Sequence, residues 1–363
     1  MKKDTEVSLF EAFETKNLKL KNRIAMAPMT RSRAIGSIPN DLMAEYYSQR
    51  SSAGLIITEG TSPSPNGLGY PRIPGIYTKE QVEGWKKITH AAHEKGAKIF
   101  IQFMHTGRIA HPANFAHEGK VLGPSAVQAD SDMWTDESGM QSIPEPEAMT
   151  EDDLKKTIAE FSQAAKDAVT AGFDGVELHG ASGYLLEQFL NPHVNVRTDQ
   201  YGGSIENRIR FVLEVAESVA NAIGAEKTGI RLSPFNTFND MPAYEETPET
   251  YTKLVEGLNK LDLAYIHLVE GFARDHKKGP GLLNVLSEKF DNLVIVNGGY
   301  DRESAEKALK EGRADLVAFG APFISNPDLP RRLQENIPLA EADKSTFYSA
   351  DEKGYTDYAF SKN

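Results

Sequence analysis

The sequence predicts an α/β fold, a single (β/α)8 barrel in which residues 1–363 form one domain. Short apolar segments of β-like composition alternate with longer segments of helical periodicity, which is the pattern of a parallel sheet covered by helices. No Gly-, Pro- or Ser-rich linker divides the chain. Because a barrel needs about 250 residues and tolerates insertions, one barrel accounts for the whole length.

The predicted strands are short runs rich in branched and aromatic residues, one for each barrel position. They are 23–27, 55–59, 98–103, 175–179, 229–232, 265–269, 293–296 and 316–319. The predicted helices are 41–52, 79–95, 151–171, 204–223, 247–261, 282–289, 302–311 and 328–336. Thr150, three residues before Asp153, and Asp301 indicate two of the helix starts.

Three segments depart from this alternation. Residues 1–22 carry alternating apolar positions and predict a hairpin that plugs the bottom of the barrel. Residues 104–148, after the third strand, are far longer than an ordinary βα loop, and we expect a lid with its own hairpin over the active face. The aromatic residues of the tail, 345–360, predict that it packs on the barrel.

Composition limits the classes of partner. The formal net charge of −12 argues against nucleic acid or an anionic membrane surface. The absence of cysteine excludes thiolate nucleophiles and cysteine-ligated metals, and His105 and His111 lack carboxylates at metal spacing, so we expect no metal site. No segment approaches ~20 apolar residues and the first residues lack a long apolar run, which predicts a cytoplasmic protein.

The stretch DGVELHGASGYLLEQFL places three polar side chains at the end of the fourth predicted strand. The carboxyl ends of barrel strands carry the chemistry in this fold, so His179, Ser182 and Tyr184 are candidate catalytic residues. His179 and Ser182 can donate to one substrate oxygen, while Tyr184 can deliver a proton to carbon. This set suits reduction of an activated alkene, although a histidine at a strand end is also compatible with a purely structural hydrogen bond.

Other strand ends carry groups suited to a flat, phosphorylated ligand. Thr30 after the first strand, Gly60 after the second and Gln102 in the third can face a ring, or can be structural. Arg231, near the end of the fifth, either forms a salt bridge with Glu177 or Asp174 or neutralises an anionic ligand.

The turns after the last two strands contain glycines. Backbone N–H groups converge on phosphate at this place in many barrels, so Gly298, Gly299 and Gly320 predict a phosphate site. The sequence contains neither a dinucleotide-binding fingerprint nor a P-loop.

With these residues assembled, the chain resembles the old yellow enzymes, a family of FMN-dependent ene-reductases, from end to end. The motifs follow in family order: MAPMTR, ITEG, HTGR, the His179 to Tyr184 cluster, NPHVNVRTDQYGGSIENR, GIRLSP, NGGY, NPDLP and GYTDY. The resemblance implies that NADPH or NADH reduces FMN. It also implies that flavin N5 then delivers hydride to the C=C bond of an α,β-unsaturated carbonyl or nitro compound, and that Tyr184 supplies the proton.

The resemblance assigns roles residue by residue. It implies flavin contacts at Ala27, Pro28, Met29, Thr30, Gly60, Gln102, Arg231, Gly298, Gly299 and Gly320. It implies substrate contacts at His179, Ser182, Tyr70, Met104 and Tyr348. Either a monomer or a homodimer is compatible with the sequence.

Three residues depart from the family pattern. Ser182 stands where the family has His or Asn, and its shorter side chain weakens the second donor to the substrate oxygen. Ala321 stands where the family often has an arginine on the flavin phosphate, which predicts weaker FMN retention. Met104 occupies a position that is often aromatic, which predicts a wider and more adaptable pocket.

Two other functions stay open from the residues alone. The glycine turns would also suit a flavin-free barrel lyase or aldolase acting on a sugar phosphate, although no strand end offers a convincing catalytic lysine. Ser182 and Ala321 would also suit a flavin-binding protein in which catalysis is weakened.

Overall fold

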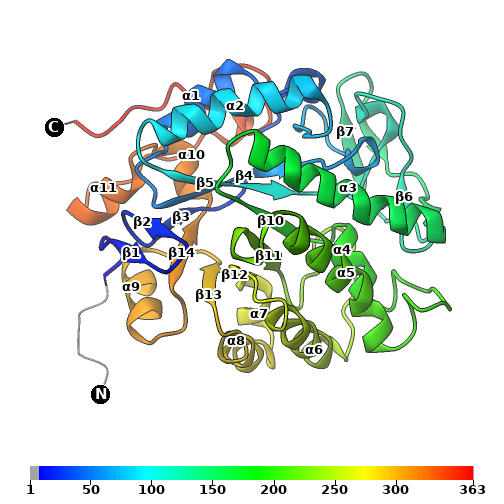
Figure 1. Ribbon diagram of the computed structural model, residues 1–363. Helices are drawn as coiled ribbons and strands as arrows, with labels where there is room; N and C mark the ends of the chain where they lie inside the picture. Colours follow the sequence, from blue (N-terminus) through cyan, green and yellow to red (C-terminus); the bar gives the residue numbers. More distant parts are fainter. Residues whose placement is uncertain (1–7, 363) are drawn as a thin grey trace.

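A computed structural model describes residues 8–362 and forms a closed parallel barrel (Figure 1). The strands are hydrogen-bonded in the order β10-β11-β12-β13-β14-β3-β4-β5, and β5 pairs with β10 to close the ring. Their bounds are β3 (Ile24–Met26), β4 (Leu55–Thr61), β5 (Lys98–Phe103), β10 (Gly175–Gly180), β11 (Thr228–Leu232), β12 (Tyr265–Val269), β13 (Leu293–Asn297) and β14 (Leu316–Phe319). The predicted fold class is confirmed, and every predicted strand is present within one or two residues.

The predicted helices surround the barrel in Figure 1. They are α1 (Asp41–Gln49), α2 (Lys79–His93), α3 (Glu151–Thr170), α5 (Ile205–Ile223), α6 (Thr247–Asn259), α8 (Gly279–Glu288), α9 (Arg302–Lys310) and α11 (Leu329–Glu335). The two predicted starts are confirmed, since the Thr150 hydroxyl accepts from the Asp153 N–H and the Asp301 carboxylate accepts from the Ser304 N–H.

Three short helices were not predicted: α4 (Leu185–Leu190), α7 (Gly271–Asp275) and α10 (Ala321–Ser325). All six residues of α4 are buried, so no polar face marks a helical period. The other two are only five residues long, which is too short for a periodic pattern. Short 3-10 turns occur at Ile35–Ser37, Pro65–Gly67, Pro112–Asn114, Ala225–Lys227 and Lys344–Thr346.

The N-terminal hairpin is formed by β1 (Phe13–Glu14) and β2 (Lys19–Leu20), which pair antiparallel. Leu20 belongs to one buried cluster with Leu55 and Leu316, the first residues of β4 and β14. The hairpin therefore packs at the amino ends of the strands, and the predicted plug is confirmed. The part of this prediction that concerns residues 1–7 lies outside the described residues.

The long connection after β5 has a hairpin of its own, as predicted. β7 (Asp132–Thr135) pairs antiparallel with β8 (Gly139–Ser142). β6 (Leu122–Gly123) and β9 (Glu147–Ala148) form a short parallel pair within the same connection.

The C-terminal tail returns to the barrel, as predicted. Tyr355 is buried and its ring stacks on Tyr46 of α1, with 4.0 Å between the ring centroids. The guanidinium groups of Arg31 and Arg33, which follow β3, donate to tail carbonyls at Gly354 (2.8 Å) and Thr346 (2.9 Å). These bonds attach the tail beside the carboxyl ends of the strands.

Between residues 8 and 362, no helix is both long enough and apolar enough to cross a lipid bilayer.

Candidate active site

A cavity of about 780 Å³ lies above the carboxyl ends of the barrel strands. Segments far apart in the sequence meet there: the segment after β3, the loop after β4, the β7–β8 hairpin, the residue before α4, the loop after β11 and the C-terminal tail. Of the predicted site residues, Thr30, Tyr70, Tyr184 and Tyr348 line it, together with Trp134 of the hairpin. The insertion therefore borders the cavity, as expected of a lid.

Arg72 links the parts of the rim. Its guanidinium forms an ion pair with Asp136 at the tip of the β7–β8 hairpin. It also donates to the backbone carbonyls of Ser32 (2.9 Å) and Tyr348 (2.8 Å). One side chain thus holds the hairpin, the segment after β3 and the tail around the same opening.

Tyr184 directly precedes α4 and presents its phenol to the cavity. Its hydroxyl lies 3.2 Å from that of Tyr70, and its ring meets the His179 ring edge to face with 4.8 Å between centroids. Burial raises the pKa of Tyr184 above its ordinary value, although the hydrogen bond with Tyr70 opposes this. At neutral pH the phenol keeps its proton and can donate it.

His179 lies near the end of β10, directly across from Arg231 in β11. Burial lowers the pKa of His179 well below its ordinary value, and the positive charge of Arg231 lowers it further. The imidazole is therefore neutral at physiological pH and can donate a hydrogen bond from one ring nitrogen.

Ser182 occupies a left-handed backbone conformation, with φ of 60°. Its backbone N–H donates to the Ser233 hydroxyl at 2.8 Å, and its carbonyl accepts from the Asn239 amide at 2.8 Å. Serine is seldom found in this region of φ, whereas asparagine is several-fold enriched there. The backbone of Ser182 is thus fixed by its neighbours at some conformational cost.

The barrel floor beneath the cavity contains a buried polar cluster. Glu177 of β10 accepts from the Gln102 amide at 2.8 Å and pairs with His267 Nδ1 at 2.9 Å. Because the Gln102 amide nitrogen is held by Glu177, its carbonyl oxygen stays available as an acceptor.

Arg231 donates to Asn297 Oδ1 at 3.0 Å. Within residues 8–362, Arg231 forms no salt bridge with Glu177 or Asp174, the alternative that the sequence left open. Glu177 pairs with His267, and Asp174 pairs with His93 and Lys98.

Three buried nitrogens of this cluster have no hydrogen-bond partner within residues 8–362: His179 Nδ1, Arg231 Nε and His267 Nε2. They come from matching positions of the adjacent strands β10, β11 and β12. A buried polar group without a partner is costly, so such a row is expected where a polar ligand completes the hydrogen bonding. Together with the Gln102 carbonyl, these groups fit the polar edge of a flavin ring. Sequence reasoning missed His267, although its polar position in YIHLV, in line with Arg231, was a usable signal.

The remaining predicted flavin residues lie around this floor. Ala27, Pro28, Met29 and Thr30 follow β3 directly. Gly320 precedes α10, and a Cβ built on it would lie 3.6 Å from Met29 Sδ. Gly299 has φ of 74°, and a Cβ built there would have no atom within 4 Å. The space beside Gly299 is therefore open, whereas a Cβ built on Gly298 would lie 3.1 Å from the Gly271 backbone nitrogen.

Met104 belongs to one buried cluster with Met133 and Tyr184, two residues that line the cavity, so it packs behind the cavity wall. Its contact with a substrate stays a prediction. Met104 is buried, and a Cβ built on Gly60 would lie 2.6 Å from its sulfur. Gly60 therefore makes room for Met104 itself. The residues that border the cavity in the described chain do not include Met104, His179 or Ser182.

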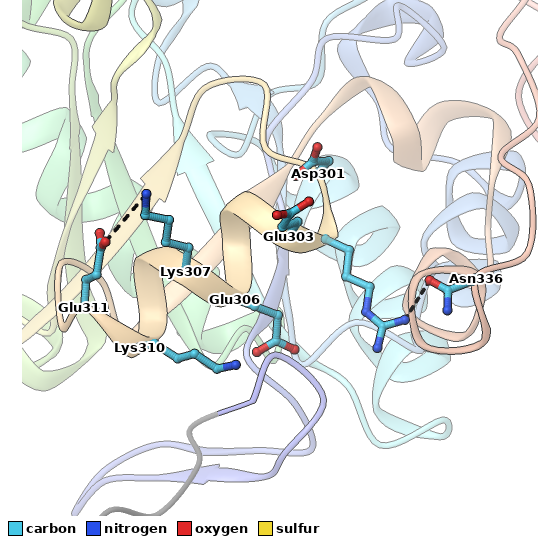
Figure 2. A pocket seen from close by; sticks show the side chains of 8 residues that line it. Asp301, Glu303, Glu306, Lys307, Lys310, Glu311 and Asn336 are labelled. Carbon is cyan, nitrogen blue, oxygen red and sulfur yellow. Dashed lines mark hydrogen bonds and ion pairs between the residues drawn. The ribbon is translucent and has the colours of Figure 1, made fainter.

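A second, more open hollow runs along α9, and Figure 2 shows its charged side chains. Lys307 pairs with Glu311, and Arg302 donates to Asn336 at 2.8 Å. Glu306 accepts from the Ser8 hydroxyl and anchors the N-terminal segment. No predicted site residue lines this hollow, whereas four of them line the cavity above the strands.

The barrel and the polar cluster at its strand ends fit a flavin-dependent oxidoreductase, and the comparison with protein families shows this class. The chain belongs to the NADH:flavin oxidoreductase / NADH oxidase family, whose model matches residues 8–340 and whose flavin is FMN. The resemblance to old yellow enzymes is confirmed.

Known relatives cover almost the whole chain. It is 43% identical over 361 residues to 12-oxophytodienoate reductase 1 of Oryza sativa subsp. japonica, covering 98% of this chain and 93% of the relative. It is 43% identical over 371 residues to chanoclavine-I aldehyde reductase of Penicillium roqueforti, covering 97% and 96%.

Solved structures agree with the fold. Morphinone reductase has a TM-score of 0.93 at 41% identity, covering 99% of this chain and 98% of that one. The old yellow enzyme homologue from Zymomonas mobilis has a TM-score of 0.92 at 40% identity, covering 97% and 99%. Morphinone reductase has also been solved in complex with tetrahydroNAD.

Proposed function

We propose that this protein is an FMN-dependent ene-reductase that uses NAD(P)H to reduce the activated C=C bond of α,β-unsaturated carbonyl or nitro compounds. The observation that carries the proposal is the Tyr184 phenol at the wall of the cavity, with its ring 4.8 Å from that of the neutral His179. Relatives named as reductases of oxophytodienoate and morphinone support it. The flavin-free lyase is not favoured, because the chain belongs to a flavin family.

Each residue has a separate task in this proposal. Bound FMN would carry the hydride between NAD(P)H and the substrate. His179, with Ser182, donates hydrogen bonds to the substrate oxygen and so stabilises the negative charge that develops there. Tyr184 gives its proton to the carbon that becomes carbanionic. Gln102 and Arg231 on the floor, and the glycine turns at Gly298–Gly299 and Gly320, hold the flavin.

The rim of the cavity supports a preference for bulky, hydrophobic substrates. Trp134, Met140, Phe238 and Tyr348 are each more than half exposed, and all four line the same opening. Exposed apolar side chains gathered at one cavity typically mark a binding surface. The enone would lie over the floor, while its apolar substituents contact these side chains.

The proposal also covers the reductant, the location of the protein, its partners and its oligomeric state. Either NADPH or NADH serves as reductant, the protein acts in the cytoplasm on small molecules rather than on nucleic acid or membranes, and it is a monomer or homodimer. The net charge of −12 supports the exclusion of polyanionic partners.

The proposal is tested with purified protein reconstituted with FMN and reduced under anaerobic conditions. We expect NADPH or NADH to bleach the flavin absorbance and 2-cyclohexenone to restore it. No binding of FMN would support the flavin-free lyase. Bleaching that no enone or nitroalkene reverses would support a flavin-binding protein with weakened catalysis.

Replacement of Ser182 by asparagine is expected to raise both the stability of the protein and its turnover. Asparagine tolerates the φ of 60° better, so the free energy of unfolding should rise by up to about 1 kcal/mol. Its longer amide also supplies the second donor to the substrate oxygen, so turnover should rise by about tenfold. Thermal unfolding and steady-state kinetics check both effects, with Ser138→Asn at the β7–β8 turn as a control. Unchanged kinetics would show that Ser182 does not lower turnover.

Ala321→Arg is expected to tighten FMN binding. Ala321 begins α10, directly after Gly320 in the predicted phosphate turn, and its side chain is exposed. A charge-assisted hydrogen bond of about 1.5 kcal/mol would lower the FMN dissociation constant roughly tenfold. Fluorescence titration of the apoprotein with FMN and with riboflavin measures this change. Equal tightening of both ligands would argue against a phosphate contact.

A further inference from the structure

The buried side chain of Glu187, in α4, takes no part in the catalytic steps proposed above. It accepts four hydrogen bonds. Its Oε1 accepts from the hydroxyls of Ser233 (2.7 Å) and Tyr251 (2.6 Å), and its Oε2 accepts from the Gly183 N–H (2.6 Å) and the Asn236 amide (3.0 Å). Every donor points at one carboxylate, so the cluster is built around a negative charge.

This cluster holds the turn that precedes Tyr184. Gly183 donates to Glu187 directly, and the Ser182 N–H donates to the Ser233 hydroxyl that Glu187 orients. Ser182 and Gly183 are consecutive left-handed residues, with φ of 60° and 78°. Such a turn persists only when its surroundings impose it, and both of its N–H groups lead to the same carboxylate.

We propose that Glu187 is a positioning residue, whose ionised carboxylate holds the Ser182–Gly183 turn so that the Tyr184 phenol and the Ser182 donor are correctly placed over the substrate. This inference rests on the proposed ene-reductase function. Glu187 does not touch the substrate, and it acts through the backbone on either side of the turn.

Protonation of Glu187 changes the geometry of this cluster. Each oxygen already accepts two hydrogen bonds, so an added proton displaces one donor. Burial raises the pKa of Glu187 to about 7, although the four donors oppose that shift. The carboxylate is ionised above this pH, so the turn is firmly held there and loosens as the pH falls. Alkene reduction should therefore rise with pH through about 7.

Other titratable groups pack near Glu187. Tyr251 bonds to it, and Tyr244 and His276 line the same small cavity of about 80 Å³. Burial raises the pKa of both tyrosines, so they stay neutral in this range. Arg208 of α5, which packs against α4, pairs with Glu246. His276 is thus the neighbour that requires a control.

The test is Glu187→Gln in the FMN-loaded enzyme, with both half-reactions followed by stopped flow between about pH 5.5 and 8.5. In the wild type we expect reoxidation by 2-cyclohexenone to become roughly tenfold faster across this range. In Glu187→Gln we expect a flat profile and a rate roughly 10- to 100-fold below the wild-type maximum. Flavin reduction by NADPH should change less than about twofold.

Control variants separate positioning from general stability. His276→Gln should keep the pH dependence, as should Glu214→Gln, which removes a carboxylate that accepts from Tyr201 on the outside of the barrel at 2.9 Å. Tyr251→Phe removes one donor to the carboxylate and should shift the pH dependence to higher pH, which tests the proposal even if Glu187→Gln does not fold.

A pH dependence that persists in Glu187→Gln, or that does not move in Tyr251→Phe, would overturn the inference alone. A wild-type enzyme that no enone reoxidises would overturn the proposed function, and the inference with it.

Discussion

Tyr184→Phe is expected to slow alkene reduction by about 10²- to 10⁴-fold. The phenol is the proton donor that the cavity offers next to His179, and burial keeps it protonated. Phenylalanine keeps the ring contact with His179 but removes the proton. Hydride transfer from NAD(P)H to the flavin needs no such proton donor, so that half-reaction should stay within about twofold. Anaerobic stopped-flow absorbance measures the two half-reactions separately.

Tyr70→Phe provides the matched control for this prediction. It removes the hydroxyl that lies 3.2 Å from that of Tyr184 but leaves the proton donor in place. The loss in alkene reduction should therefore be at most about tenfold, as expected for one neutral hydrogen bond. An equal loss of both half-reactions in Tyr184→Phe would contradict the assigned role.

Arg231→Met is expected to weaken FMN binding by roughly 10- to 150-fold. This range corresponds to the loss of one hydrogen bond to a charged donor, which contributes about 1.5 to 3 kcal/mol. Arg231 Nε is buried without a partner within residues 8–362, and Nη2 alone is held, by Asn297. The guanidinium is therefore available to a ligand at the barrel mouth. Methionine fills similar space without charge. Titration of the apoprotein with FMN, followed by flavin fluorescence, measures the dissociation constant.

Arg231→Lys separates charge from shape in this prediction. Lysine keeps the positive charge but lacks the planar fork, so its FMN affinity should fall between those of the wild type and Arg231→Met. Thermal unfolding of each apoprotein shows whether the fold is intact. Unchanged FMN affinity in a folded Arg231→Met protein would exclude the flavin contact.

The sequence by itself determined the barrel and the identity of its strand ends. Alternation between short apolar runs and helical periods is local information, so segments such as 98–103 and 265–269 were predicted with correct bounds. Caps such as Thr150 with Asp153 are equally local, since donor and acceptor lie three residues apart. Motifs along the whole chain, from MAPMTR to GYTDY, indicated the family, and the residues from His179 to Tyr184 suggested the chemistry.

Only the tertiary structure decided which polar groups meet. Tyr70 and Tyr184 lie 114 positions apart in the chain, and Glu177 and His267 lie 90 apart, so no local pattern specifies either contact. A local pattern also does not specify that Arg231 bonds to Asn297 rather than to Glu177, or that Met104 packs against Gly60. Helix α4 was missed because burial on all sides erased its periodicity. Periodicity shows which face of a helix or strand is apolar. Contacts between elements depend instead on the register of strands that are distant in sequence. The closed barrel fixes that register.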